Sequence, residues 1–215
     1  NTGAIKDYTK SIELDPEDVQ AYYSRASAKF NLGDYTGSIL DYTKFIELYP
    51  EDAQSYYWRA LAKYVLGDYT RAIADFTKAI ELNPNDADAY NNRGLSKNDL
   101  KDYNGAINDY TKAIELNPNN AVHYYNRGIS KNDLKDYNGA INDYTKAIEL
   151  NPNYAGAYHN RGISKNDLKD HNGAIADFTK SIEINPNDAL AYSNRGISKE
   201  NLGDLNGACV DWKKA

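Results

Sequence analysis

The chain has 215 residues, of which 31 are acidic and 25 are basic, so its formal net charge is −6 at pH 7. An acidic chain gains nothing from approaching nucleic-acid phosphates or anionic lipid, so neither partner class is expected. The single cysteine, Cys209, excludes an internal disulfide framework and a multi-cysteine metal site. No apolar run approaches the roughly 18 residues of a membrane-spanning helix, so membrane insertion is not expected.

The chain has only one cysteine and no Asn-x-Ser/Thr acceptor site, and both fit a reducing compartment, so a cytoplasmic location is expected. It contains no methionine and begins inside a repeated pattern, so we expect it to be a fragment whose native N-terminus lies elsewhere.

Prolines recur at a constant interval of 34 residues, and a fixed period in the range of roughly 20–50 residues is typical of repeat architectures. Tyrosine, alanine and aromatic columns keep the same step. The prolines are Pro16, Pro50, Pro84, Pro118, Pro152 and Pro186; the tyrosines are Tyr22, Tyr56, Tyr90, Tyr124, Tyr158 and Tyr192. The segments 91–118 and 125–152 are nearly identical, which indicates duplication within the chain.

Taken in chain order, the period predicts a single solenoid domain over residues 1–215. Residues 1–18 are expected to be the second helix of a truncated unit. Five complete units are expected at 19–52, 53–86, 87–120, 121–154 and 155–188, and residues 189–215 form an incomplete last unit.

Each unit predicts two helices, as the segment from Asp86 to Pro118 shows. Asp86 is a good N-cap, because its carboxylate can accept a hydrogen bond from the first turn of a helix over 87–99. A turn at 101–102 follows, at the place where three other units carry glycine. From Tyr103 onward, apolar residues spaced by three and four predict a second helix, and Pro118 ends it.

Four Asn-Gly pairs, at 104–105, 138–139, 172–173 and 206–207, would normally indicate tight hairpin turns between strands. Helical periodicity follows each pair, so we interpret them as the first turns of second helices.

These columns resemble the tetratricopeptide repeat. In the third unit the matching residues are Tyr90, Gly94, Asp102, Tyr103, Ala106, Tyr110, Ala113 and Pro118. The resemblance covers the whole chain and implies an all-α fold, a right-handed superhelical solenoid of 34-residue helix-turn-helix repeats. It also implies that the first helices line a concave wall. Because one hairpin cannot bury its own apolar face, the units must stack. Neither end has a polar capping helix, so end-to-end association of identical chains is expected.

Two basic columns stand on the first helices and one acidic column on the second. The basic columns are Arg25, Arg59, Arg93, Arg127, Arg161, Arg195 and Lys29, Lys63, Lys97, Lys131, Lys165, Lys199; the acidic one is Asp7, Asp41, Asp75, Asp109, Asp143, Asp177, Asp211. The arginines could bind phosphate or carboxylate ligands, or pair with the aspartates in each unit. The matching recurrence favours Arg–Asp pairs. We expect the lysine stems to cover apolar surface and their ammonium groups to stay in water.

The resemblance assigns partner binding to the exposed side of the first helices. Its N-terminal part is aromatic, and its C-terminal part combines asparagines with aliphatic residues. The candidate residues are Tyr23, Phe30, Tyr57, Trp58, Leu61 and Tyr64, then Asn91, Asn92, Leu95, Asn98, Tyr125, Asn126, Ile129, Asn132, Asn160, Ile163 and Asn194. Asparagine amides could hold an extended peptide backbone, and aromatic residues could anchor side chains. Alternatively, the asparagines serve solubility and were copied by duplication.

No catalytic constellation interrupts the repeat. His123, His159 and His171 have no metal-ligand spacing, and Cys209 stands in an isoleucine column where we expect core packing. The sequence therefore predicts a non-catalytic scaffold without a cofactor, which binds an extended or helical segment of a protein or peptide partner. The alternatives are a self-assembling structural module and, less favoured because the wall has no exposed basic column, an RNA-binding helical repeat.

Overall fold

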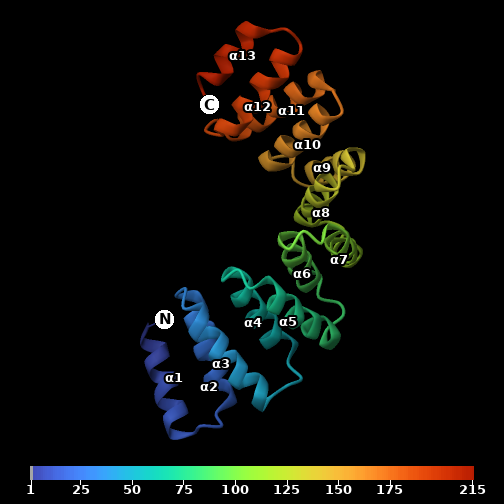
Figure 1. The fold of residues 1–215 in the computed structure, drawn as a ribbon. Coiled ribbons are helices and arrows are strands. Elements are labelled where there is room, and N and C mark those ends of the chain that lie inside the picture. The colour runs from blue at the N-terminus through green and yellow to red at the C-terminus, as the bar shows by residue number, and fades with distance from the viewer. Residues whose placement is uncertain (1) are drawn as a thin grey trace. The chain divides into compact units, whose positions relative to one another are not determined.

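In the computed structural model, residues 2–215 are described, and they form thirteen α-helices and no strand (Figure 1). The predicted all-α class is confirmed. The helices are α1 (Thr2–Leu14), α2 (Val19–Asn31), α3 (Tyr35–Leu48), α4 (Ala53–Val65), α5 (Tyr69–Leu82), α6 (Ala87–Asp99), α7 (Tyr103–Leu116), α8 (Ala121–Asp133), α9 (Tyr137–Leu150), α10 (Ala155–Asp167), α11 (His171–Ile184), α12 (Ala189–Asn201) and α13 (Leu205–Trp212).

Consecutive helices pack as hairpins, from α2–α3 to α12–α13, with α1 against α2. The α4–α5 hairpin shows why: Phe76 and Ala72 of α5 are fully buried together with Ala60 of α4. The small residues let the two helices approach, and the aromatic ring fills the space between them. Because these residue types recur with the period, the same packing recurs along the chain.

Short polar side chains determine where the helices begin. The Asp86 carboxylate accepts hydrogen bonds from the backbone N–H groups of Asp88 and Ala89, so the N-cap prediction is confirmed. Helix α6 spans Ala87–Asp99, which are the predicted bounds.

The turn inside each hairpin uses a left-handed backbone conformation. Gly67 has φ +79°, and Lys101 takes the same place in its hairpin with φ +63°. A side chain in this region costs on the order of 1 kcal/mol, which glycine avoids. The Asn104-Gly105 pair lies in the first turn of α7, as predicted.

The chain divides into two compact units, one ending at Leu116 and one running from Asn117 to Ala215. Within each unit, successive first helices contact one another: α2 with α4, α4 with α6, α8 with α10, and α10 with α12. No such contact joins successive second helices of a unit in the described residues. The first helices therefore line the inner side of each unit, which we call the inner wall. Over residues 2–215, no helix is both long and apolar enough to cross a membrane.

Candidate partner-binding surface

The arginine column is bound inside the fold. Arg25 donates from Nε and Nη2 to the two carboxylate oxygens of Asp41, at 2.8 and 2.7 Å, and from Nη1 to Thr9 Oγ1 at 3.1 Å. Its guanidinium lies over the Tyr22 ring, 5.7 Å from the centroid. Bonding to Asp41 raises the pKa of Arg25, although burial opposes this shift. The same ion pair recurs at Arg59–Asp75, Arg93–Asp109, Arg127–Asp143, Arg161–Asp177 and Arg195–Asp211. The predicted Arg–Asp pairing is confirmed.

The prediction that the lysine ammonium groups stay in water is wrong. Lys29 Nζ lies 2.8 Å from Asp41 Oδ2, and the Lys29 side chain is only 19% exposed. The five other lysines of the column contact their aspartates at 2.6–2.8 Å. Lysine and arginine lie one helical turn apart on the same face, so both reach one carboxylate and neither column is available to a ligand.

The aromatic part of the inner wall lies in the first unit and is half-buried. Phe30 of α2 and Trp58 of α4 meet edge-on at 5.5 Å between ring centroids, and Trp58 meets Tyr57 at 5.4 Å. Tyr57, Leu61 and Tyr64 pack against the buried core of the α4–α5 hairpin. Burial raises the pKa of Tyr57 to about 12. These side chains are held in place by their neighbours and still reach the surface, as does Tyr23, whose ring meets Tyr42 at 5.5 Å.

A first set of asparagines, Asn92, Asn160 and Asn194, links successive first helices. Asn160 Nδ2 donates to Tyr125 Oη at 3.1 Å, and in the first unit Asn92 Nδ2 donates to Tyr57 Oη at 2.8 Å. Asn194 Nδ2 lies 3.2 Å from His159 Nε2, which takes the place of the tyrosine hydroxyl. In the described part of the chain, the Oδ1 atoms of these three asparagines accept no hydrogen bond. One side of each amide therefore stabilises the stack, and the carbonyl side stays available.

A second set of asparagines, Asn132 and Asn166, makes a similar link. Ser164 Oγ donates to Asn132 Oδ1, and Asn166 Nδ2 donates to Ser198 Oγ, both at 2.7 Å. The serines are fully buried, so the asparagines satisfy polar groups that water cannot reach. The asparagines therefore contribute to the stability of the inner wall, a role that the sequence reasoning missed.

Two predicted wall residues are not exposed. Asn91 and Asn126 are each only 8% exposed, so the prediction that they face a partner is wrong. Asn91 stands in the column of Tyr57, whose ring packs against the core of its hairpin. Asn126 stands in the column of Asn92 and Asn160, whose amides bond to the preceding first helix.

A groove opens beside a first helix in each unit. In the first unit its volume is about 310 Å³; it is lined by Ala4 and Tyr8 of α1 and by Gln20, Tyr23, Ser24, Ser27, Ala28 and Asn31 of α2. In the second unit its volume is about 280 Å³; it is lined by Ile163, Asn166 and Asp167 of α10, by Lys169 and His171, and by Asn194, Ile197 and Asn201.

The grooves bring together only part of the predicted site. Ile163 and Asn194 meet in the second unit, and Tyr23 lies in the first, whereas the half-buried Leu95 and Ile129 line neither groove. Lys169 and His171 were missed because they belong to the turn and to a second helix, outside the first-helix columns. His171 Nδ1 lies 2.9 Å from Asn166 Oδ1, and this contact joins the start of α11 to the end of α10 at the edge of the groove.

Within residues 2–215, no three His, Cys, Asp or Glu side chains are arranged to hold a metal ion. Cys209 is exposed, so the prediction that it packs in the core is wrong. It lies in α13, the last described helix, on a face that no further described hairpin covers. The absence of a cofactor and of catalysis remains a prediction.

Sequence profiles of the tetratricopeptide repeat match residues 1–53, 23–87, 87–120, 121–154, 155–188 and 178–209. The chain belongs to the tetratricopeptide repeat family. A search of curated proteins found no match to this chain.

Solved structures share the fold of this tetratricopeptide repeat protein. A crystal structure of MamA is 29% identical, covers 72% of this chain and 91% of its own, and has a TM-score of 0.69. YrrB, described as a tetratricopeptide repeat protein with an unusual peptide-binding site, is 24% identical over 86% of this chain and 95% of its own, with a TM-score of 0.73. PilW, a type IV pilus biogenesis factor, is 17% identical over 90% of each chain, with a TM-score of 0.78. Nothing in these similarities points to an enzyme.

Proposed function

We propose that this tetratricopeptide repeat protein is a non-catalytic scaffold whose inner walls bind an extended or helical segment of a partner protein. The observation that carries the proposal is the composition of the inner wall. Half-buried aromatic and aliphatic side chains stand there beside the side-chain carbonyl groups of Asn92, Asn160 and Asn194, which accept no hydrogen bond within the described chain. Such a surface can bury apolar side chains of a partner and also accept hydrogen bonds from its backbone N–H groups.

Several side chains of the inner wall are also in contact with their neighbours before any partner arrives. Trp58 is fixed between Phe30 and Tyr57, and Asn194 is fixed by His159. A surface whose side chains are already ordered loses less conformational entropy on binding. We therefore expect affinities in the micromolar range, about −8 kcal/mol. YrrB, which shares the fold, is the protein described with a peptide-binding site; for the present chain, peptide binding rests on its own inner wall.

The repeat itself supplies substitutions that test this proposal without disturbing the fold. Trp58→Asn introduces the residue that four other units carry in that column, and Ile197→Ser introduces the residue at position 27. Val210→Asn is the matched control: it also removes an exposed apolar side chain, lies on a second helix, and introduces the residue found at positions 108 and 142.

The experiment is affinity capture with mass spectrometry, followed by calorimetry on the partner segments identified. We expect at least one partner to lose about tenfold or more in affinity with Trp58→Asn or Ile197→Ser, since each removes an anchor, and to be retained by Val210→Asn. If both wall variants keep full affinity while their circular dichroism is unchanged, the inner wall is not the binding surface.

Self-association is a second candidate function, because one face of α1 is uncovered. Ala4 and Tyr8 are partly exposed, whereas Ala72 and Tyr42 in the same columns are 0% and 1% exposed. In the other hairpins a first helix covers these columns. A helix from a second copy of the chain could take that place.

A further inference from the structure

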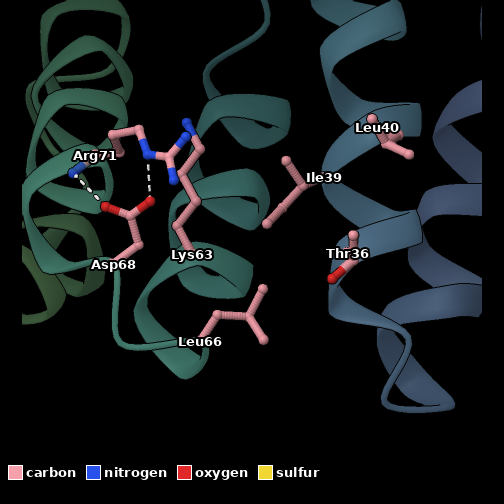
Figure 2. Close-up of a pocket in the computed structure, with 7 residues that line it drawn as sticks. All are labelled: Thr36, Ile39, Leu40, Lys63, Leu66, Asp68 and Arg71. Carbon is pink, nitrogen blue, oxygen red and sulfur yellow. Dashed lines mark hydrogen bonds and ion pairs between the residues drawn. The ribbon is translucent and has the colours of Figure 1, made fainter.

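A pocket of about 340 Å³ lies in the first unit, away from the inner wall (Figure 2). It is formed by α3 of one hairpin and by the end of α4, the turn and the start of α5 in the next. Its lining is Thr36, Ile39, Leu40, Lys63, Leu66, Asp68 and Arg71. None of these residues belongs to the predicted partner-binding set, and the volume is at the lower end of those of ligand pockets.

The apolar part of the pocket is open to solvent. Leu40 is 66% exposed and Leu66 is 52% exposed, and Ile39 lies next to them (Figure 2). Large aliphatic side chains left this exposed around a hollow are a feature of interaction sites.

The opposite side of the pocket carries two cationic side chains, each paired with an aspartate. Figure 2 shows Arg71 and Lys63 on the side of the pocket that Ile39 faces, with Leu40 beyond Ile39 on α3. Lys63 is bound to Asp75 at 2.6 Å. The Arg71 side chain is 77% exposed and its Nε donates to Asp68. In the described residues, its two terminal amino groups donate no hydrogen bond, so they can receive a carboxylate.

Leu40 and Arg71 depart from the repeat, whereas Leu66 and Lys63 belong to recurring columns. Every other position in the Arg71 column is glycine, and no other position in the Leu40 column is leucine. The equivalent place in the next hairpin of the same unit has Ala74 and Gly105 instead. Stacking of the hairpins therefore requires neither Leu40 nor Arg71. The positive charge of Arg71 is also opposite to the net charge of its surroundings, because residues 1–116 contain 13 basic and 19 acidic side chains.

We infer that this pocket is a second docking surface, which binds a partner-protein segment carrying a carboxylate beside a large apolar side chain. The apolar side chain enters between Leu40 and Leu66, and the carboxylate pairs with the Arg71 guanidinium, whose planar donors match it. Charge complementarity selects this occupant over a basic segment. The surface is separate from the inner wall, so either proposal can fail while the other stands.

The test uses the full chain, labelled with ¹⁵N, and three probes with the same apolar body: phenylbutanoate, phenylbutanol and phenylbutylamine. We expect chemical-shift changes at Leu40, Leu66 and Arg71. The carboxylate should bind about five- to tenfold more tightly than the alcohol, because a charge-assisted hydrogen bond adds to the apolar contact. The amine should bind most weakly.

Three variants separate the contributions. Arg71→Gly and Leu40→Ala introduce residues that the chain already carries in those columns, so the hairpins should stay folded. Arg71→Gly should remove the preference for the carboxylate and leave binding of the alcohol unchanged, and Leu40→Ala should weaken all three probes. Lys112→Gln, which removes an exposed cation elsewhere in the unit, is the control and should change nothing.

Equal affinities of the three probes would overturn the proposal. Equal effects of Lys112→Gln and Arg71→Gly on probe affinity would also overturn the proposal, because they would show that net charge, and not a specific site, favours the carboxylate. A sedimentation mass above that of the monomer would show that the occupant is a second copy of this chain, provided that Leu40→Ala lowers this mass. That result would likewise overturn the proposal.

Discussion

At the scale of single residues, each aspartate of the acidic column from Asp41 onward neutralises two cations. Asp177 accepts from Arg161 Nε and Nη2 at 2.9 and 2.7 Å and contacts Lys165 Nζ at 2.7 Å, and its side chain is 6% exposed. The two cations are themselves only 16% and 21% exposed. Water cannot replace the carboxylate there, so the fold depends on it more than on any surface ion pair.

Asp177→Asn should therefore lower the free energy of unfolding by about 3–5 kcal/mol, because it leaves two half-buried cations without their counter-charge. Urea titration followed by circular dichroism measures this. Glu183→Gln is the control: Glu183 pairs with Lys180 at 2.9 Å but is 58% exposed, so the loss should be about 0.5 kcal/mol or less. Equal losses for the two variants would contradict the prediction.

His159 occupies a position where other units have tyrosine. Its Nε2 lies 3.2 Å from Asn194 Nδ2, its Nδ1 lies 3.5 Å from Asp188 Oδ2, and its ring meets Phe178 at 5.5 Å. Burial lowers the pKa of His159 below its usual 6.5, although Asp188 acts in the opposite direction. The folded protein therefore disfavours the protonated ring.

Stability contributed by His159 is present above about pH 6.5 and is lost as the pH falls through the lower folded-state pKa. His159→Tyr should remove this component, because Tyr125 already accepts a hydrogen bond from Asn160 at the same place in its hairpin. We expect the variant to lose less stability than the wild type between about pH 7.5 and pH 5. Identical pH profiles from urea titration would show that His159 does not contribute.

At the scale of the elements, a glycine of the first helix faces an aromatic ring of the second helix in four hairpins. A Cβ added at Gly162 of α10 would lie 2.8 Å from the Phe178 ring of α11. The ring is fully buried and cannot move away without displacing its neighbours. The distance between α10 and α11 is therefore set by this contact.

Gly162→Ala should lower the free energy of unfolding by about 1–3 kcal/mol, even though alanine is the better helix former. Gly3→Ala in α1 is the control, since a Cβ there meets no atom within 4 Å, and it should be neutral or slightly stabilising. Thermal unfolding of both variants measures the difference, and a stabilised Gly162→Ala protein would show that the two helices can separate at little cost.

At the scale of the whole molecule, we expect the uncovered face of α1 to be the contact if the chain associates with itself. If a second copy covers Ala4 and Tyr8, sedimentation velocity should show a mass that rises with concentration. Tyr8→Lys should suppress the rise, because it places a charge in an apolar contact. Tyr49→Lys, the same change at a 54% exposed tyrosine outside the groove, should leave it intact. A monomer at all concentrations would leave partner capture as the remaining candidate.

The sequence by itself determined what recurs with its period: the helical class, the bounds of α6, the caps such as Asp86, and the Arg–Asp pairs. These depend on contacts within one hairpin, which are the same in every copy. Only the tertiary structure decided the rest. The hydrogen bonds of the asparagine amides and the burial of Asn91 and Asn126 depend on what faces them in space. The pocket at Leu40 and Arg71 depends on residues of two hairpins that break the repeat. The physical reason is that a column of residues gives the position of a side chain on its own helix, whereas its partner is set by the distance to the helix beside it.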